Sequence, residues 1–325
     1  MRACSVDMRS AILVPMQGSH FSRRAVVVGL GSLPLLSYAA ATGGPATWRD
    51  AARARDLPVL VRWPTVEPKG VVLYSHGLGG SCLGGAVWGA AWADAGFVVV
   101  HVQHPGSDLH IWAGGARAIE AAATPAQFLA RAQDVAFVLD EVVRLRTGPW
   151  STVPARIGVA GHSFGARVTM AIAGETFPAA IVPPMADLRP TAFLALSPGL
   201  EGPGNPRERL AAVTRPLLGV TGSLDGDPLG RGTTPEKRAE VFDLLPEGAR
   251  AMLWLDGADH ATFAGTPGVP LPREAVALAR EPAHHALVAS VTSDWWLANL
   301  ADETAAKARL AAPAGLGASD RWRFG

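Results

Sequence analysis

A serine framed by glycines stands where an apolar run of the chain ends. Residues 157–166 read IGVAGHSFGA, and Gly161-His162-Ser163-Phe164-Gly165 within them fits the pattern G-x-S-x-G. In this pattern the serine occupies a sharp turn from strand to helix, with strained backbone angles and an exposed hydroxyl. Small residues at both ends are what such a turn requires. Ser163 is therefore predicted to be a nucleophile for acyl transfer.

A serine hydroxyl is a poor nucleophile until an imidazole takes its proton and a carboxylate holds that imidazole in the right tautomer. His260, in DGADHATF, lies just past the last strand-like run, and Asp225, in TGSLDGDP, ends the run before it. The order Ser163, Asp225, His260 is the order that this serine motif requires. We predict a catalytic triad of these three residues, with Asp227 as the competing acid.

Glycines in a second loop predict where the site stabilises the negative charge that develops on the substrate oxygen during acyl transfer. The segment SHGLGGS, residues 75–81, directly follows an early apolar run. Acyl transfer passes through an oxyanion that preorganised donors must stabilise, and the backbone N–H groups of Leu78 and Phe164 are the natural pair. His76 and His162 are interpreted as residues that position their turns, with contact to a ligand left open.

Aromatic residues near these loops are candidates for binding a substrate. Phe164, beside the nucleophile, and Trp112 are predicted to contact it, in a pocket walled by the loop 104–124. Trp88 and Trp92 share a helix face, because they are four residues apart, and either core packing or an aromatic wall fits that spacing.

The other histidines carry no chemistry in this interpretation. His101 and His104 are three residues apart, with no third ligand in register, so no metal site and no cofactor are predicted. His284 and His285 occupy adjacent, divergent positions of a helix and are expected to face solvent.

Strand-like runs that alternate with helical stretches must position these loops. Such alternation predicts an α/β fold with a mostly parallel sheet covered by helices on both faces. The predicted strands are 57–63, 70–77, 97–105, 156–163, 191–199, 216–225 and 250–260. The predicted helices are 84–95, 125–146, 164–173, one that starts near residue 234, and 281–300.

The helix 125–146 has the clearest amphipathic pattern. Apolar side chains recur on one face and charged side chains occupy the others, which is typical of a helix that covers a sheet. The apolar positions are Val135, Val138, Leu139, Val142 and Val143. The charged positions are Arg131, Asp134, Asp140, Glu141 and Arg144.

Taken together, the motifs HGLGG, GHSFG, GSLD and GADH resemble those of the α/β-hydrolases, over residues 57–300. The resemblance is to the branch of dienelactone-hydrolase-like and platelet-activating-factor-acetylhydrolase-like esterases. Dienelactone hydrolases use a cysteine where this chain has Ser163, so their chemistry is not implied. Similar acetylhydrolases carry the acid after the strand that follows the serine turn, where this chain offers Glu201, which stays a second alternative to Asp225.

The resemblance and the triad together imply a serine hydrolase that cleaves small-molecule esters through an acyl-enzyme. An amide hydrolase or an acyltransferase would use the same residues. A non-catalytic binding protein that keeps the fold is the alternative from another class.

Composition excludes several kinds of partner. Of the 325 residues 49% are hydrophobic and 18% charged, with a formal net charge of +1, which gives no electrostatic reason to expect nucleic acid or an anionic membrane. No apolar run in the body of the chain reaches the roughly 18 to 20 residues of a membrane-spanning helix. The two cysteines, Cys4 and Cys82, cannot build a disulfide framework. A single domain is predicted over residues 42–325, with a short C-terminal tail.

The first residues are typical of a targeting signal. Arg23 and Arg24 precede a mildly apolar stretch, residues 25–36, and then small residues up to 41. This arrangement resembles a bacterial twin-arginine export signal, with cleavage expected before Thr42. We therefore predict a signal peptide over residues 1–41 and a periplasmic or secreted protein.

Overall fold

The computed structural model describes residues 44–145, 147–228, 230, 232–248, 250–266 and 273–325. These residues belong to one compact unit that spans residues 40–325. The predicted signal peptide, residues 1–41, lies outside the described residues.

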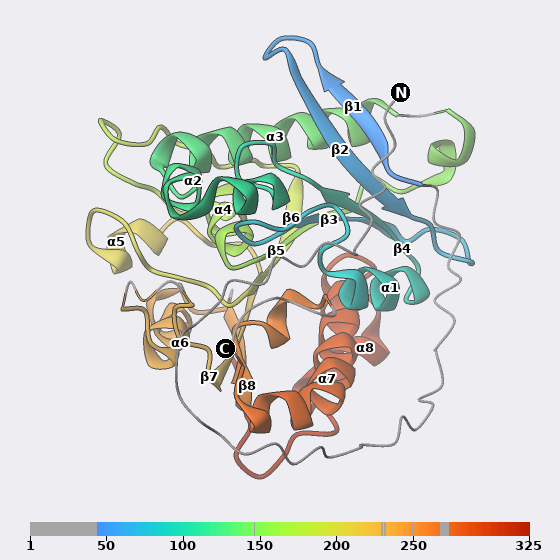
Figure 1. Ribbon diagram of the computed structural model, residues 1–325. Coiled ribbons are helices and arrows are strands. Elements are labelled where there is room, and N and C mark those ends of the chain that lie inside the picture. The colour runs from blue at the N-terminus through green and yellow to red at the C-terminus, as the bar shows by residue number, and fades with distance from the viewer. Residues whose placement is uncertain (1–43, 146, 229, 231, 249, 267–272) are drawn as a thin grey trace, which may run out of the picture. The chain divides into compact units, whose positions relative to one another are not determined.

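Within the described residues, nine strands form one sheet in the order β1-β2-β4-β3-β5-β6-β7-β8-β9 (Figure 1). The strands from β3 to β8 run parallel to one another, whereas β1, β2 and β9 pair with their neighbours in the antiparallel direction. The strands are β1 (Ala46–Asp50), β2 (Arg55–Arg62), β3 (Gly70–Ser75), β4 (Phe97–Val102), β5 (Ile157–His162), β6 (Pro190–Leu196), β7 (Leu217–Leu224), β8 (Arg250–Asp259) and β9 (Arg321–Phe324).

Helices cover both faces of the sheet, as Figure 1 shows. One face packs against α1 (Ala86–Asp94), α7 (Ala275–Asn299) and α8 (Thr304–Ala311). The other packs against α3 (Pro125–Arg144), α4 (Phe164–Ala173) and α6 (Pro235–Leu244). The shorter helices are α2 (Gly115–Ala122), α5 (Pro206–Leu210) and the 3₁₀ turns η1 (Leu109–Gly114), η2 (Gly148–Thr152) and η3 (Thr262–Ala264). The predicted α/β architecture is confirmed.

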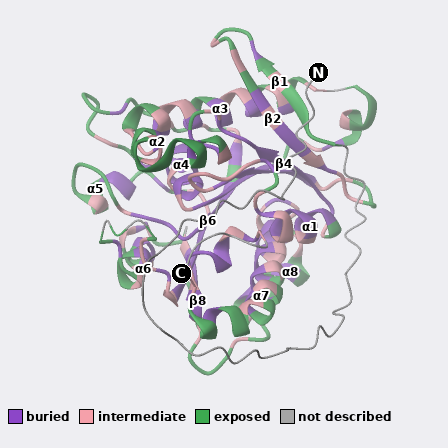
Figure 2. Ribbon diagram, viewed as in Figure 1, coloured by how far each residue is buried: buried purple, intermediate pink, exposed green. Residues whose placement is uncertain are grey.

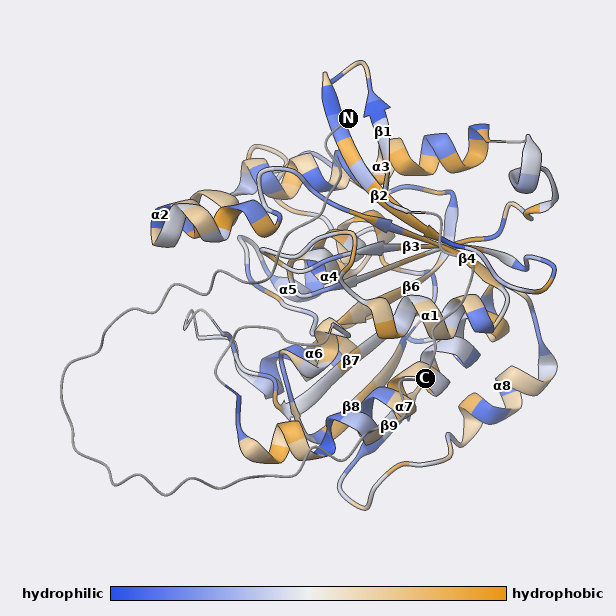
Figure 3. Ribbon diagram, turned by 45° about the vertical axis from the view of Figure 1, so that its right-hand side comes forward, coloured by the Kyte–Doolittle hydropathy of each residue, from blue (hydrophilic) through white to orange (hydrophobic). Residues whose placement is uncertain are grey.

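Strand β3 shows why the sheet needs both layers of helices. Successive side chains of a strand point to opposite faces, so Val71 and Leu73 pack with α3 and α4, whereas Val72 and Tyr74 pack with α1 and α7. All four are buried, which is the pattern of a parallel strand covered on both sides. Figure 2 shows the buried residues concentrated in the sheet and on the helix faces that meet it. Figure 3 shows hydrophobic residues along the same central strands.

The charged face predicted for α3 is wrong at two positions. Arg131 and Asp134 are fully buried, whereas Val143, assigned to the apolar face, is 39% exposed. The reason is that the buried end of α3 lies under polar backbone and side-chain groups at the ends of β3 and β4. Arg131 donates to the carbonyls of His76 and Ser107, and Asp134 accepts from Arg55.

The C-terminal segment adds to the sheet, whereas a short tail was predicted. Strand β8 is not the last strand, because β9 pairs with it in the antiparallel direction after α8. The guanidinium of Arg321 lies 4.3 Å from the ring centre of Trp254 on β8, and that of Arg323 lies 4.0 Å from the ring centre of Phe242 on α6. A four-residue strand of alternating arginine and aromatic residues is too short to be told from a tail by its pattern.

The prediction that His284 and His285 face solvent is also wrong. His284 is buried, and His285 Nε2 lies 3.0 Å from the backbone oxygen of Thr262. The His285 ring also meets Trp88 edge-on, with ring centres 5.1 Å apart. Helix α7 packs on β6 and β8 and contacts η3, so both positions meet protein. Among the described helices, none combines the length and the hydrophobicity needed to cross a lipid bilayer.

Candidate active site

The predicted site residues gather at one edge of the sheet. Ser163 directly follows β5, Asp225 follows β7, His260 follows β8 and Leu78 lies in the loop after β3. These strands are parallel, so their carboxyl ends share an edge. The chain passes from β3 to β4 on one side and then to β5 on the other, and the crevice at such a switch point is where open α/β sheets place their ligands.

Ser163 occupies a strained turn between β5 and α4. Its backbone angles are φ 53° and ψ −114°, a conformation that non-glycine residues rarely adopt. Close packing explains the flanking glycines: a Cβ on Gly161 would lie 2.3 Å from the carbonyl carbon of Gly165, and a Cβ on Gly165 would lie 2.0 Å from the oxygen of Ser75. The Ser163 N–H donates to the Leu196 oxygen at 2.9 Å, which helps hold the turn.

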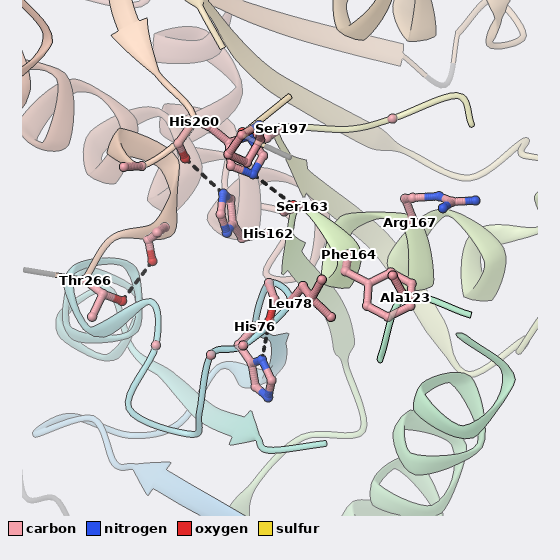
Figure 4. A pocket seen from close by; sticks show the side chains of 18 of the residues that line it. His76, Leu78, Ala123, His162, Ser163, Phe164, Arg167, Ser197, His260 and Thr266 are labelled. Atoms are coloured by element: carbon pink, nitrogen blue, oxygen red, sulfur yellow. Dashed lines mark hydrogen bonds between the residues drawn. The ribbon is translucent and has the colours of Figure 1, made fainter. Parts of the chain in front are cut away.

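The three residues of the predicted triad are connected by hydrogen bonds. His260 Nε2 lies 2.9 Å from Ser163 Oγ, and His260 Nδ1 lies 2.7 Å from Asp225 Oδ1. Figure 4 shows the imidazole reaching Ser163 from the loop after β8. Asp225 is fully buried and His260 is buried, while Ser163 is partly exposed to the pocket. This is the geometry in which an imidazole can accept the serine proton.

The environment of Asp225 keeps its carboxylate charged. Burial alone would raise its pKa, but the hydrogen bond from His260 and the positive charge of Arg238 outweigh burial, so the pKa of Asp225 lies below its ordinary value. Arg238 Nε lies 3.1 Å from Asp225 Oδ1, and Thr221 Oγ1 donates to Oδ2 at 2.8 Å. An ionised carboxylate only accepts, so His260 carries its proton on Nδ1 and leaves Nε2 free to accept from Ser163.

The competing acids have other partners in the structure. Glu201 is hydrogen-bonded to Thr233 Oγ1, and Asp227 lies in the pocket wall two residues beyond Asp225. Of the three carboxylates, Asp225 is the one bonded to His260. Arg238 and Thr221, which hold this carboxylate, were not found from the sequence, and no motif marks them.

Leu78 and Phe164, the predicted oxyanion donors, both line the pocket beside Ser163 (Figure 4). Phe164 is the first residue of α4, where a backbone N–H has no partner within the helix and the helix dipole favours negative charge. The loop with Leu78 packs closely on the serine turn, since a Cβ on Gly77 would lie 2.9 Å from His162 Nδ1.

His162 supports the backbone of the proposed base. Its Nε2 lies 3.1 Å from the backbone oxygen of His260 and donates to it, and the two rings have centres 4.8 Å apart. His162 also lines the pocket, as does His76. The interpretation of these two histidines as positioning residues is therefore compatible with contact to a ligand.

A second serine–histidine–aspartate array lies beside the loop 76–81, which carries Leu78 and is called the oxyanion loop below for the role predicted for it. His104 Nε2 is 2.9 Å from Ser75 Oγ, and His104 Nδ1 is 3.0 Å from Asp134 Oδ2. All three side chains are buried and none lines the pocket, so this array cannot meet a substrate. It links the end of β3, at Ser75, to α3, at Asp134, just before the loop that carries Leu78.

His101 and His104 do not form a metal site together. His101 Nδ1 donates to the Gly84 oxygen at 2.9 Å, while Arg62 Nε donates to its Nε2 at 3.3 Å. His104 is occupied by Ser75 and Asp134. Among the described residues, no group of three or more histidine, cysteine, aspartate or glutamate side chains could hold a metal ion.

The pocket over Ser163 has a volume of about 410 Å³. Its lining includes both apolar and charged side chains. The apolar side chains include Leu78, Leu109, Trp112, Ile119 and Phe164. The charged side chains include Arg167, Glu201 and Asp227. The loop 104–124 is thus part of the wall, as its sequence position predicts.

The tryptophans divide between core and pocket. Trp112 is 45% exposed, and its Nε1 donates to the Gly79 oxygen at 2.9 Å, which places its ring against the oxyanion loop. Trp88 and Trp92 are fully buried and bond to Phe263 and Thr292. The core alternative therefore holds for Trp88 and Trp92, and Trp112 faces the pocket.

Four buried histidines in and beside the site share a lowered pKa. Burial lowers the pKa of His101 to about 3 and that of His104 to about 4, with Asp134 opposing it at His104. Burial, reinforced by neighbouring positive charges, also lowers the pKa of His76 and His162 well below the ordinary value. The folded protein keeps these rings neutral, whereas the unfolded chain takes up protons below about pH 6.5.

We expect the free energy of unfolding to fall as the pH drops below about 6.5, by up to about 1.4 kcal/mol per pH unit for each of these histidines. Urea unfolding followed by circular dichroism between about pH 7.5 and about pH 5 measures the slope. His101→Gln should reduce the slope by up to about 1.4 kcal/mol per pH unit, the contribution of one histidine. A free energy of unfolding that is constant over this range would contradict the neutral, buried state of the four rings.

Two solved structures of similar fold are esterases. A ferulic acid esterase from Streptomyces cinnamoneus is 21% identical, with a TM-score of 0.55 over 79% of this chain and 86% of that chain. The esterase domain of a Rhodothermus marinus protein is 15% identical, with a TM-score of 0.49 over 78% of this chain and 97% of that chain. No family model and no curated protein matches the sequence. The strand order and the first of these similarities define the α/β-hydrolase fold, which confirms the predicted fold class.

Proposed function

We propose that this protein is a serine hydrolase that cleaves carboxylic esters of small molecules through an acyl-enzyme. The observation that carries the proposal is the array Ser163–His260–Asp225, bonded in sequence and open to a pocket of about 410 Å³. The fold hosts many chemistries, so the proposal depends on these site residues and not on the fold.

Each residue has a defined part in the proposed reaction. Ser163 Oγ bonds to the ester carbonyl carbon while His260 Nε2 takes its proton, and Asp225 stabilises the resulting imidazolium. The carbonyl oxygen becomes an oxyanion held by the N–H groups of Leu78 and Phe164. The alcohol then leaves with the proton from His260. Water repeats these steps on the acyl-enzyme, which releases the acid and restores Ser163.

The pocket favours esters with an apolar or aromatic group near the scissile bond. Leu109, Trp112 and Phe164 form a wall suited to such a group. The Streptomyces neighbour is a ferulic acid esterase, and ferulic acid is an aromatic acid. Within the resemblance to dienelactone-hydrolase-like and acetylhydrolase-like esterases, Ser163 argues for serine chemistry. An acid at Asp225, after β7, differs from that of the acetylhydrolases, which carry it after β6.

A panel of p-nitrophenyl esters from acetate to palmitate, together with a feruloyl ester, tests the proposal on the purified protein. We expect turnover of at least one ester, at a rate above the uncatalysed reaction. Amide cleavage in place of ester cleavage, or transfer of the acyl group to an added alcohol in place of water, would reassign the reaction on the same residues. Absence of turnover together with absence of fluorophosphonate labelling would favour a binding protein.

We further propose that the protein is exported by the twin-arginine route, on the strength of Arg23 and Arg24 before the apolar stretch 25–36. A receptor recognises the arginine pair as an address, and lysine keeps the charge without keeping the recognition. The Arg23→Lys, Arg24→Lys double variant is therefore expected to stay in the cytoplasm. Cell fractionation measures this, with Arg2→Lys, Arg9→Lys as the matched control. Unchanged export of the first variant would show that this pair is not the signal.

A further inference from the structure

Arg131, which the proposed reaction does not use, is fully buried behind the oxyanion loop. Its donors are directed at backbone and hydroxyl oxygens. Nη1 donates to the His76 oxygen at 2.5 Å, Nη2 donates to the oxygens of Gly77 at 3.2 Å and Ser107 at 3.0 Å, and Nε donates to Ser107 Oγ at 2.7 Å. The guanidinium thus joins the loop after β3 to the loop after β4.

This placement is costly, since a buried charge is unfavourable unless it is compensated. The carboxylate one turn along α3, Asp134, pairs with Arg53, Arg55 and His104. Burial lowers the pKa of Arg131 to about 9, against the charges of Asp134 and Asp108, so the guanidinium stays charged at neutral pH. A positive charge is therefore held where backbone carbonyls are its direct partners.

One of these carbonyls belongs to the peptide group that supplies the proposed oxyanion donor. The oxygen of Gly77 and the N–H of Leu78 are in the same planar peptide unit, and in a trans peptide they point in opposite directions. Arg131 Nη2 holds that oxygen, so the Leu78 N–H is directed away from Arg131. A cation on the carbonyl also polarises the peptide and strengthens its N–H as a donor.

His76 holds the same carbonyl from a second direction. Its Nε2 accepts from the His104 N–H at 3.1 Å, so the neutral ring carries its proton on Nδ1. Nδ1 then donates to the Gly77 oxygen at 2.6 Å. The Gly80 N–H also donates to this oxygen, at 3.2 Å. Arg131, His76 and the Gly80 N–H together fix the orientation of the Gly77–Leu78 peptide.

Arg131 also touches the residue that supplies the second donor. Its guanidinium carbon lies 4.6 Å from the ring centre of Phe164, and that ring stacks on Phe128. The same buried side chain therefore contacts the peptide group of one donor and the side chain of the other.

We infer that Arg131 is a positioning residue for the oxyanion hole, acting through the Gly77–Leu78 peptide and the Phe164 ring. The inference rests on the proposed function, because an oxyanion forms only if Ser163 attacks a carbonyl. Arg131 touches no substrate. Its effect is to hold both donors where the charge develops, so that removing it weakens binding of the transition state more than binding of the ester.

Arg131→Met and Arg131→Lys test the inference on a p-nitrophenyl ester that the wild-type protein cleaves. Methionine removes the charge, and lysine keeps it but cannot donate to His76, Gly77 and Ser107 together. We expect kcat to fall by about 10- to 100-fold per active site in both variants, with KM changed by less than about threefold. The concentration of active sites is determined by complete labelling with a fluorophosphonate, so that misfolded protein is not counted when kcat is calculated.

A trifluoromethyl ketone supplies the readout that a structural role would not change. It forms a tetrahedral adduct with Ser163 whose oxygen occupies the oxyanion hole, so its inhibition constant should rise by the same factor as kcat falls. Arg144→Met, on the exposed side of α3, is the matched control and should leave both values unchanged.

Three results overturn the inference. If folded Arg131→Met keeps the wild-type kcat per site, the side chain does not position the hole. If Arg131→Met does not fold, Arg131→Lys decides, and wild-type kcat and ketone affinity in that variant refute the role. If the wild-type protein neither cleaves any ester nor reacts with the fluorophosphonate, the proposed function fails and the inference fails with it, whereas an active wild-type protein with unaffected variants refutes the inference alone.

Discussion

Replacing Ser163 with alanine is expected to lower ester hydrolysis by a factor on the order of 10⁴ to 10⁶, because the acyl-enzyme cannot form without the hydroxyl. The fold should persist. Alanine keeps the backbone hydrogen bond from residue 163 to the Leu196 oxygen, and it faces the same cost as serine at the positive φ angle. The loss is measured as kcat/KM on the best ester, with circular dichroism to confirm folding.

Ser151→Ala is the matched control for this variant. Ser151 is exposed and donates to the Gly148 oxygen at 2.7 Å, so its replacement also removes one hydroxyl hydrogen bond but lies away from the pocket. We expect wild-type rates from it. A folded Ser163→Ala protein that still works within a few-fold of the wild-type rate would end the serine-hydrolase proposal.

Replacing Asp225 with asparagine is expected to lower turnover by about 10² to 10⁴, by comparison with the corresponding change in a well-characterised serine protease triad. Arg238 Nε lies 3.1 Å from Oδ1, so the amide oxygen should keep that position and still accept from His260 Nδ1. The loss then comes chiefly from the missing negative charge, which can no longer stabilise the imidazolium formed during attack.

Asp227→Asn and Glu201→Gln show whether Asp225 is the acid. Neither side chain is hydrogen-bonded to His260 in the described structure, so each change should cost far less than Asp225→Asn. The kinetics of all three variants on one ester decide the assignment. If turnover is lost in Asp227→Asn or Glu201→Gln while Asp225→Asn stays within a few-fold of the wild-type rate, Asp225 is not the acid of the triad.

The sequence predicts the site geometry as far as topology alone determines it. Ser163, Asp225 and His260 each follow a strand, and parallel strands bring their carboxyl ends to one edge whatever the packing beneath them. The choice among Asp225, Asp227 and Glu201 as the partner of His260 depends on how the backbone turns after β6 and after β7. The order of the residues in the sequence cannot show these turns.

The support for the site could not be predicted in the same way. Helical periodicity sorts residues by type, so it assigns Arg131 and Asp134 to a solvent face, yet both are buried because β3 and β4 end over that part of α3. Backbone carbonyls such as that of Gly77 have no sequence signature, although they are the partners that make burial of Arg131 tolerable. Strand β9 is not predicted because its four residues are too few to show the alternation of apolar and polar side chains that marks a strand.

Fluorophosphonate labelling followed by peptide mass spectrometry is the most direct test of the claim that Ser163 is an activated nucleophile. Such a reagent phosphonylates a serine whose proton an adjacent base accepts, and leaves ordinary surface serines unmodified. We predict one equivalent of label on the peptide that contains Ser163, with none in Ser163→Ala and much slower labelling in Asp225→Asn. Label on another residue, or no label on folded wild-type protein, would contradict the account.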